Sequence, residues 1–378
     1  MVKSKNTYIL NQSPFIAILI SSALLAFLGT VTSTDFIVSF GSWWVYLMPE
    51  PVLIRQILPI LLGIIVGLVA IQYAGFYRRY GIYFFIAGII LLAIPLFQFN
   101  KSWVPLFTRM VTIHSGYWGI LFSLPLMVNL LEKRSAGIKP FWISFVMPWV
   151  VLNLLLFLQR DFNILVLLNL LAMVILFKSH LMKWQKLGMV LVFLVLSIST
   201  LVIFKQDYLR FHWKDFRRQL PNLANYEEVL PVTCFVDLAE SGITGQGLDS
   251  FHKPEDPSLP STIRGFVPYE ITPRQYPLKL LCRQLGWFGF ALAFLLYYVL
   301  IHSSWFFVKG IQNNENRRLA LMLFYLLFIP VGFQIIKNIS PLGILPSYEL
   351  HFLGWGPHNG MFPLVVGGLI YGLSKESE

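Results

Sequence analysis

The feature that most constrains this chain is a series of apolar runs, each close to the length that crosses a lipid bilayer. Polar turns separate the runs, which we place at about residues 14–32, 55–74, 82–97, 114–131, 141–158, 164–177, 187–204, 278–301, 319–336 and 352–373. Roughly 20 apolar residues in helical form span the hydrocarbon core of a bilayer. A membrane barrel would instead show short segments of alternating polarity. We therefore predict an all-α integral membrane protein, a ten-span helical bundle.

The composition agrees with a membrane protein. Of 378 residues, 56% are hydrophobic, 16% are aromatic and 12% are charged, and the mean hydropathy is +0.67. Soluble domains carry about 25% charged residues. The formal net charge of +11 does not indicate nucleic-acid binding, because the basic residues lie in turns between the apolar runs. The first run lacks a cleavage site of the A-x-A kind, so we interpret it as a span.

The same basic residues orient the bundle. With the N-terminus in the cytoplasm, fourteen Lys and Arg side chains fall in inner segments and five in short outer segments, namely Arg55, Lys101, Arg109, Arg160 and Lys337. Cytoplasmic turns of membrane proteins carry the excess of Lys and Arg. We therefore predict a multi-pass protein of a cytoplasmic membrane, with both termini cytoplasmic and the longest loop outside.

That loop, about residues 205–277, is the long polar segment of what we read as one domain over residues 1–378. Three glycines, Gly242, Gly245 and Gly247, lie within six residues of one another in it. Long irregular loops are uncommon unless they are functional or disordered. Glycines let a ligand approach the backbone closely and can cradle a phosphate on amide groups, whereas a bend needed only for packing is the alternative.

Charged side chains in and near the loop allow two interpretations each. Lys253, Arg264 and Arg274 could hold a pyrophosphate or could simply be solvated. Asp161, at a predicted outer turn, is favoured as the N-cap of the next helix. Its alternative is a role with Gln159 in a polar cavity, since carboxylates at membrane depth are often functional.

Metal and disulfide signals are weak. Glu349, His351 and His358 match no metal-ligand spacing, so we expect no metal ion to be bound by them. The two cysteines, Cys234 and Cys282, fall near the same predicted face, so a disulfide could form. We nevertheless expect two inert thiols.

Several blocks, in a fixed order along most of the chain, carry a family resemblance. The first block is Arg55-Gln56 at the start of the second span, and the second is LLLFLQRDFNILVLL, which contains Gln159 and Asp161. The third is SGITGQGLDSFHK, with Ser241, Gly242, Gly245, Gly247, Leu248, Ser250 and Lys253. RQLGWFG is the fourth, and the fifth is FLGWG, which comes after Gln334, Asn338, Gly343 and Pro346. In order and spacing, these blocks resemble the SEDS family (shape, elongation, division and sporulation), the group of FtsW, RodA and SpoVE, whose members also have ten spans.

The resemblance implies a role in peptidoglycan biogenesis, in cell elongation or division. It implies glycosyl transfer from lipid II, a polyprenyl-pyrophosphate-linked sugar, in partnership with a single-span class B penicillin-binding protein. Membrane lipid is a further expected partner, and nucleic acid is not. The substrate-binding residues would be Ser241, Gly242, Gly245, Gly247, Ser250, Lys253, Gln159, Asp161 and Arg274.

The chain departs from the family at the expected catalytic position. The family's essential Asp corresponds to Gln275, and its fourth-span motif Gln-Pro-Ser-Glu-x-x-Lys reads IHSGYWG here. Glycosyl transfer needs a carboxylate base, and cations or a divalent metal ion to steady the departing pyrophosphate. Glu270 is the best-placed substitute base and Asp256 the reserve. The alternatives are a pseudoenzyme scaffold for cell-wall partners or, ranked last, a transporter of lipid-linked oligosaccharide.

Overall fold

The structure is a computed structural model of the whole chain, and it describes residues 14, 16–29, 50–97, 103–106, 111–132, 145–178, 187–188, 190–193, 195, 242–245, 277–339, 351, 353 and 357–376. Packing divides the chain into two compact units. Unit 1 comprises Met1–Gly67, Leu230–Phe307 and Pro330–Gly367, and unit 2 comprises Leu68–Val229, Val308–Ile329 and Gly368–Glu378. The reading of residues 1–378 as one domain stays a prediction.

Helices build nearly all of the described structure. They are α3 (Glu50–Gln72), α4 (Ala74–Arg79), α5 (Gly81–Phe97), α6 (Ser115–Glu132), α8 (Met147–Leu158), α9 (Phe162–Lys178), α13 (Pro277–Gly310), α14 (Asn314–Ile339) and α15 (Pro357–Lys375). Within the described residues, one antiparallel hairpin, β1 (Trp103–Leu106) with β2 (Val111–His114), pairs Trp103 with His114. The all-α prediction is confirmed by this helical architecture.

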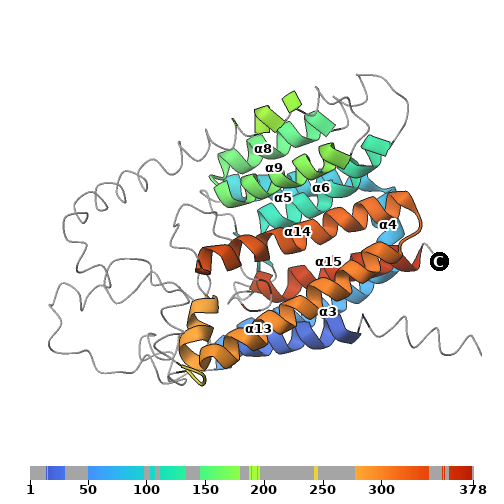
Figure 1. Cartoon of the computed structure of the whole chain (residues 1–378). Helices are drawn as coiled ribbons and strands as arrows, with labels where there is room; N and C mark the ends of the chain where they lie inside the picture. The colour runs from blue at the N-terminus through green and yellow to red at the C-terminus, as the bar shows by residue number, and fades with distance from the viewer. Residues whose placement is uncertain are drawn as a thin grey trace, which may run out of the picture. The chain divides into compact units, whose positions relative to one another are not determined.

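In unit 2, α5 packs on α6 and α8, and α8 packs on α9; Figure 1 shows these four helices side by side. Small residues let α5 and α6 approach closely, because a Cβ atom added to Gly88 would lie 3.1 Å from the carbonyl oxygen of Gly119. The Trp149 indole donates to Oδ1 of Asn169 over 2.9 Å and thereby links α8 to α9. Both polar groups are buried, so each satisfies the other where water is excluded.

In unit 1, glycines bring α3 against α15. A Cβ atom at Gly63 would lie 2.7 Å from the Cα atom of Met361, and one at Gly67 would lie 2.9 Å from the carbonyl oxygen of Leu364. The two glycines are four residues apart and so lie on one face of α3. Small residues at this spacing are a common way for apolar helices to approach in a lipid environment, where dispersion contacts replace the hydrophobic effect.

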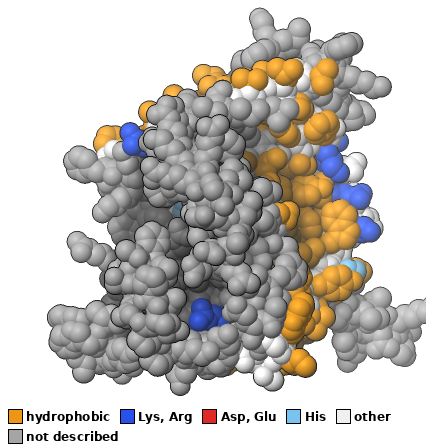
Figure 2. Space-filling view, turned by 60° about the vertical axis from the view of Figure 1, so that its left-hand side comes forward, with side chains coloured by type: hydrophobic (Ala, Val, Ile, Leu, Met, Phe, Trp, Pro, Cys, Tyr) orange, Lys and Arg blue, Asp and Glu red, His pale blue; other side chains and the backbone are white. Residues whose placement is uncertain are grey.

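The exterior of the described helices is largely apolar. Along α5, Ile82, Ile86 and Ile90 form an outward stripe, each about half exposed, and Leu61, Ile65 and Leu68 do the same on α3. Figure 2 shows hydrophobic side chains over much of the described surface, with basic side chains at its margin. Among the described residues, two helical stretches, Leu281–Gly310 and Asn314–Ile336, are long and apolar enough to cross a bilayer.

The predicted spans agree with most helix positions but not with every boundary. The eighth span was expected to end near residue 301, whereas α13 continues to Gly310. Ser303 and Ser304 in this extension are buried. The expected loop after the third span contains the β1–β2 hairpin. Most of the seventh span and most of the loop at 205–277 lie outside the described residues.

The expectation of inert thiols is wrong. Cys282 is disulfide-bonded and fully buried near the start of α13. The sequence contains one other cysteine, Cys234, which lies outside the described residues. Sequence spacing alone did not show that the start of α13 is tied by a covalent bond.

Candidate functional site

The glycine-rich block of the long loop forms a turn that closes a kink in α13. Gly286 has φ 59° and ψ −149°, which interrupts the helix. A helical segment that restarts after such a residue has amide groups without partners from its own helix. Here the backbone N–H groups of Trp287 and Phe288 donate to the carbonyl oxygens of Gly242 and Ile243, each over 3.1 Å.

Glycine is required at two positions of this contact. Gly245 has φ 81°, and a Cβ atom there would overlap the carbonyl group of Gln284. A Cβ atom at Gly286 would overlap the carbonyl oxygen of Gly242. The turn therefore presents carbonyl oxygens to the restarted helix, and its close backbone approach serves packing on α13. A role of Gly242 and Gly245 in holding a phosphate stays a proposal.

A second cluster of polar groups lies in unit 2, between α8 and α9. Arg160 takes a left-handed conformation, φ 56°, at the end of α8. The Arg160 amide donates to the Phe157 carbonyl over 3.0 Å, and the Asp161 amide donates to the Leu156 carbonyl over 3.1 Å. These bonds form a Schellman motif, which normally carries glycine at its left-handed position. Since Arg occupies that position, no residue type in this turn signals the motif.

Asp161 has two partners at this turn. One carboxylate oxygen, Oδ1, accepts the backbone N–H of Ile164 over 3.4 Å, the geometry of an N-cap on α9. The other, Oδ2, lies 3.3 Å from Nε2 of His114, the last residue of β2. The side chains of Asp161 and His114 are both almost fully buried.

Gln159 extends the cluster to two more helices. Its Oε1 accepts the Ser115 hydroxyl over 3.2 Å, and its Nε2 donates to the Leu92 carbonyl of α5. Gln159 and Ser115 are buried. Gln159 and Asp161, predicted together, therefore lie in one polar cluster with His114 and Ser115. Those two were missed as site residues, although IHSGYWG places them at the same predicted outer level.

The loop before α15 is fixed to α13 within unit 1. The Tyr297 hydroxyl donates to the backbone carbonyl of His351 over 2.6 Å, and the His351 ring lies 5.8 Å from that of Phe362. Burial lowers the pKa of His351 to about 3, so its imidazole is neutral at ordinary pH. Glu349 and the His358 side chain lie outside the described residues, and the expectation that no metal is bound there stays a prediction.

The other expected site residues lie outside the described residues. They are Ser241, Gly247, Ser250, Lys253, Asp256, Glu270, Arg274 and Gln275. The structure thus describes the two ends of the predicted loop site, the glycine turn and the start of α13. The candidate base and cations between them remain expectations from the sequence.

Comparison with solved structures defines the class of fold: the chain has the SEDS fold. It is similar over 95% of its length to the rod shape determining protein RodA of Thermus thermophilus, with 13% identity and a TM-score of 0.60. A mutant of the same RodA gives 14% identity and a TM-score of 0.62. A structure of a peptidoglycan synthase complex, which coordinates polymerisation and crosslinking, gives 17% identity and 0.63 over 95% of this chain and 97% of that one.

The shared fold covers 97% of the RodA mutant chain and 96% of the unmodified one. No protein-family profile and no curated protein sequence matches this chain. The family resemblance seen in the sequence blocks is confirmed at the level of the fold.

Proposed function

We propose that this chain is a SEDS-type protein of a bacterial cytoplasmic membrane that serves peptidoglycan biogenesis. The observation that carries the proposal is the similarity to RodA structures along 95% of the chain. The ordered sequence blocks, including the Gln159–Asp161 turn and the Gly242–Gly245 turn, support it independently because each occupies a defined structural position.

The membrane placement is supported by the apolar exterior and by the two long apolar stretches in α13 and α14. We place ten spans in the bilayer, with both termini cytoplasmic and residues 205–277 outside. Reporter fusions after Lys139 and at Lys253 test this orientation. The expected result is activity of a cytoplasmic reporter at Lys139 and of an extracytoplasmic reporter at Lys253, and equal behaviour at both sites would contradict it.

The proposed substrate is lipid II. In this account, a carboxylate of the outer loop deprotonates the acceptor hydroxyl of the growing glycan, with Glu270 as the first candidate and Asp256 as the second. Lys253 and Arg274 steady the departing pyrophosphate, with a divalent cation as the alternative. Ser241, Gly247, Ser250, Gln159 and Asp161 complete the proposed substrate contacts. A single-span class B penicillin-binding protein is the proposed partner, by analogy with the synthase complex.

A scaffold without polymerase activity is the second candidate. The observation that favours it is Gln275 at the position of the family's essential Asp, together with the missing Glu and Lys of IHSGYWG. A scaffold would bind the partner or the lipid-linked sugar without glycosyl transfer.

Lipid II turnover by the purified protein with its candidate partner distinguishes a polymerase from a scaffold. Loss of a general base lowers rates by roughly 10²–10⁴-fold, so Glu270→Gln should nearly abolish turnover while leaving thermal stability unchanged. Asp256→Asn tests the reserve position in the same assay. An inactive wild type that becomes active only as Gln275→Asp would overturn the enzyme proposal in favour of the scaffold. Turnover that none of the three substitutions changes would show that the base has been placed wrongly.

A further inference from the structure

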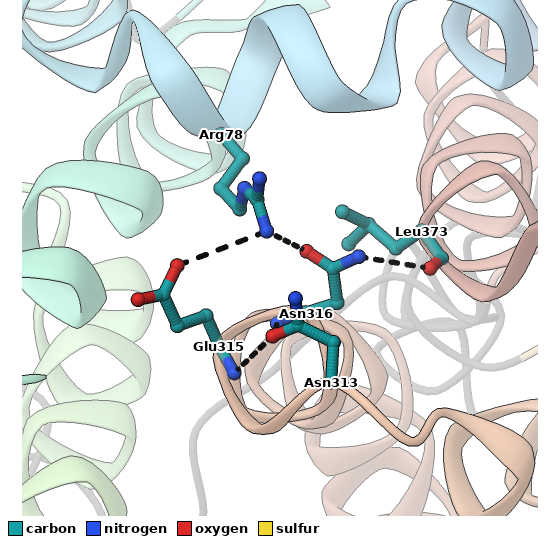
Figure 3. Close-up of polar contacts among 5 residues, drawn as sticks. All are labelled: Arg78, Asn313, Glu315, Asn316 and Leu373. Atoms are coloured by element: carbon teal, nitrogen blue, oxygen red, sulfur yellow. Dashed lines mark hydrogen bonds and ion pairs between the residues drawn. The ribbon is translucent and has the colours of Figure 1, made fainter. Parts of the chain in front are cut away.

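Two adjacent arginines of α4 have different surroundings. Arg78 turns inward within unit 2, where its Nη1 donates to Oδ1 of Asn316 over 2.5 Å and lies 3.8 Å from the carboxylate of Glu315 (Figure 3). Asn316 is buried and donates in turn to the Leu373 carbonyl over 3.3 Å. Arg78 therefore ties α4 to the start of α14 and the end of α15.

Arg79 is exposed, and no hydrogen bond or ion pair joins it to another residue in the part of the chain that the structure describes. Its guanidinium is thus available to a ligand, unlike that of Arg78. Guanidinium groups bind phosphate oxygens in a bidentate manner.

Exposed aromatic rings lie beside Arg79. Phe76 and Tyr80 pack at 4.4 Å between ring centroids, and Tyr80 and Tyr83 at 6.0 Å. Tyr80, with φ −104° and ψ 34°, separates α4 from α5, and the ring contacts of Tyr80 join Phe76 of α4 to Tyr83 of α5. Arg79 follows Phe76 by three residues within α4, so these two side chains share a face of that helix. Aromatic rings of this kind gather where a protein meets lipid headgroups.

An aliphatic stripe runs along α5 and begins next to these rings in the sequence. Ile82, Ile86 and Ile90 share one face of α5 and are 56%, 49% and 57% exposed. Along α4 and α5, the exposed side chains therefore include a cation, then aromatic rings, then an aliphatic stripe. This order matches the phosphate, the glycerol region and the acyl chain of a phospholipid.

The charge around α4 favours an anion. Six basic side chains and two carboxylates, those of Glu315 and Glu376, lie near the helix ends that Arg78 joins, among the described residues of unit 2. The basic residues are Arg78, Arg79, Lys309, Arg317, Arg318 and Lys375. Glu376 lies beside Gly75, where an added Cβ atom would overlap its carboxylate. Lys375 is held over the Tyr371 ring at 4.9 Å. The net charge of these side chains is therefore positive even with both carboxylates ionised.

We propose that Arg79, with the exposed rings of Phe76, Tyr80 and Tyr83, binds the phosphodiester headgroup of an anionic glycerophospholipid, whose acyl chain lies along Ile82, Ile86 and Ile90. Each basic side chain near a membrane surface typically strengthens binding to anionic lipid about fivefold. The site rests on the membrane embedding in the proposed function, and it is independent of any glycosyl transfer.

Lipid retention and thermal stability of the purified protein test the site, with phosphatidylglycerol compared against phosphatidylcholine. Wild type should retain phosphatidylglycerol in native mass spectrometry and gain thermal stability from it in a saturable way. Arg79→Gln should weaken the phosphatidylglycerol effect about fivefold. Lys178→Gln removes an exposed cation on the same predicted side of the membrane and is the matched control for a general charge effect, so its loss should be smaller than that of Arg79→Gln.

Arg78→Gln distinguishes a loss of protein stability from a loss of lipid recognition. It should lower the melting temperature in both lipids, because Asn316 and Glu315 lose their partner, while the preference for phosphatidylglycerol persists. Equal retention of the two lipids by wild type, or equal phosphatidylglycerol affinity of wild type and Arg79→Gln, would overturn the proposal. Stabilisation by inorganic phosphate as large as that by phosphatidylglycerol would also overturn it, in favour of a free-anion site. A chain that stays in solution after detergent removal would overturn both this site and the membrane placement.

Discussion

At the scale of single residues, Gly245 carries a clear steric requirement. A non-glycine residue in the left-handed region costs about 1–2 kcal/mol, and a Cβ atom there would also overlap the Gln284 carbonyl. We expect Gly245→Ala to lower the thermal stability of the purified protein by at least that amount. Gly332→Ala is the control, because a Cβ atom on Gly332 of α14 meets open space. Equal melting temperatures for Gly245→Ala and wild type would contradict the close packing of the turn on α13.

Asp161 allows its capping role to be separated from its charge. Asparagine retains an oxygen that can accept the Ile164 amide, whereas alanine does not, and loss of an N-cap costs about 1 kcal/mol. We therefore expect Asp161→Ala to be less stable than Asp161→Asn in thermal unfolding. If Asp161 also contacts substrate, Asp161→Asn should reduce lipid II binding with little loss of stability. Identical stabilities of the two variants would exclude the cap as the main role.

His351 gives the protein a pH-dependent stability with a defined sign. Its pKa is lowered to about 3 by burial, so below pH 6.5 the unfolded chain takes up a proton that the folded chain does not. Stability is complete above pH 6.5 and should fall by up to about 1.4 kcal/mol per pH unit as the pH drops from there towards 3. Melting temperatures of wild type, His351→Gln and the exposed control His302→Gln between pH 7 and 5 measure this. A slope that His351→Gln leaves unchanged would assign the pH dependence to other groups.

Single residues also show where sequence reasoning succeeds and stops. Asp161 was predictable as a cap because an Asp directly before an apolar run is a local signal. The kink at Gly286 was not, because LGWFG opens the apolar run that follows Arg283 and Gln284, and only its contact with a distant turn reveals the break. The buried contact of His114 with Asp161 was missed for the same reason, since 47 residues separate the pair.

At the scale of elements, the start of α13 is held by two separate attachments. Cys282 forms a disulfide there, and one helical turn later the Gly242–Gly245 turn closes the kink at Gly286. Both attachments hold the start of α13 in place. Apolar runs indicate where helices form, whereas helix ends are less well defined by the sequence, and the predicted end of the eighth span was too early.

The disulfide of Cys282 is expected to stabilise the fold by about 2–4 kcal/mol, as bonds that close long loops do. Cys282→Ala should therefore lower the melting temperature under oxidising conditions. If Cys234 is its partner, Cys234→Ala should cause the same loss, and the double variant should lose no more than either single one. Peptide mapping without reductant would identify the linked pair directly. Additive losses from the two substitutions would contradict pairing.

At the scale of the whole molecule, the fold was predictable because hydropathy dominates a chain with so few charged residues. An apolar exterior on α3, α5 and α13 is what a lipid solvent requires, and the sequence alone contains this information. The proposed chemistry depends instead on a few polar positions, among them Glu270 and Gln275, whose roles no periodicity can define. The similarity to RodA structures therefore shows the fold, while the chemistry has to be measured.

Binding of lipid II by the purified protein, reconstituted in lipid nanodiscs, tests the central claim most directly. Both the polymerase and a scaffold that holds the lipid-linked sugar require it, so the measurement does not depend on Glu270 being the base. We expect saturable binding of lipid II, no comparable binding of the soluble disaccharide-peptide, and retained binding by Glu270→Gln. Absence of lipid II binding, both with and without a class B penicillin-binding protein, would contradict the proposed substrate of this SEDS-fold protein.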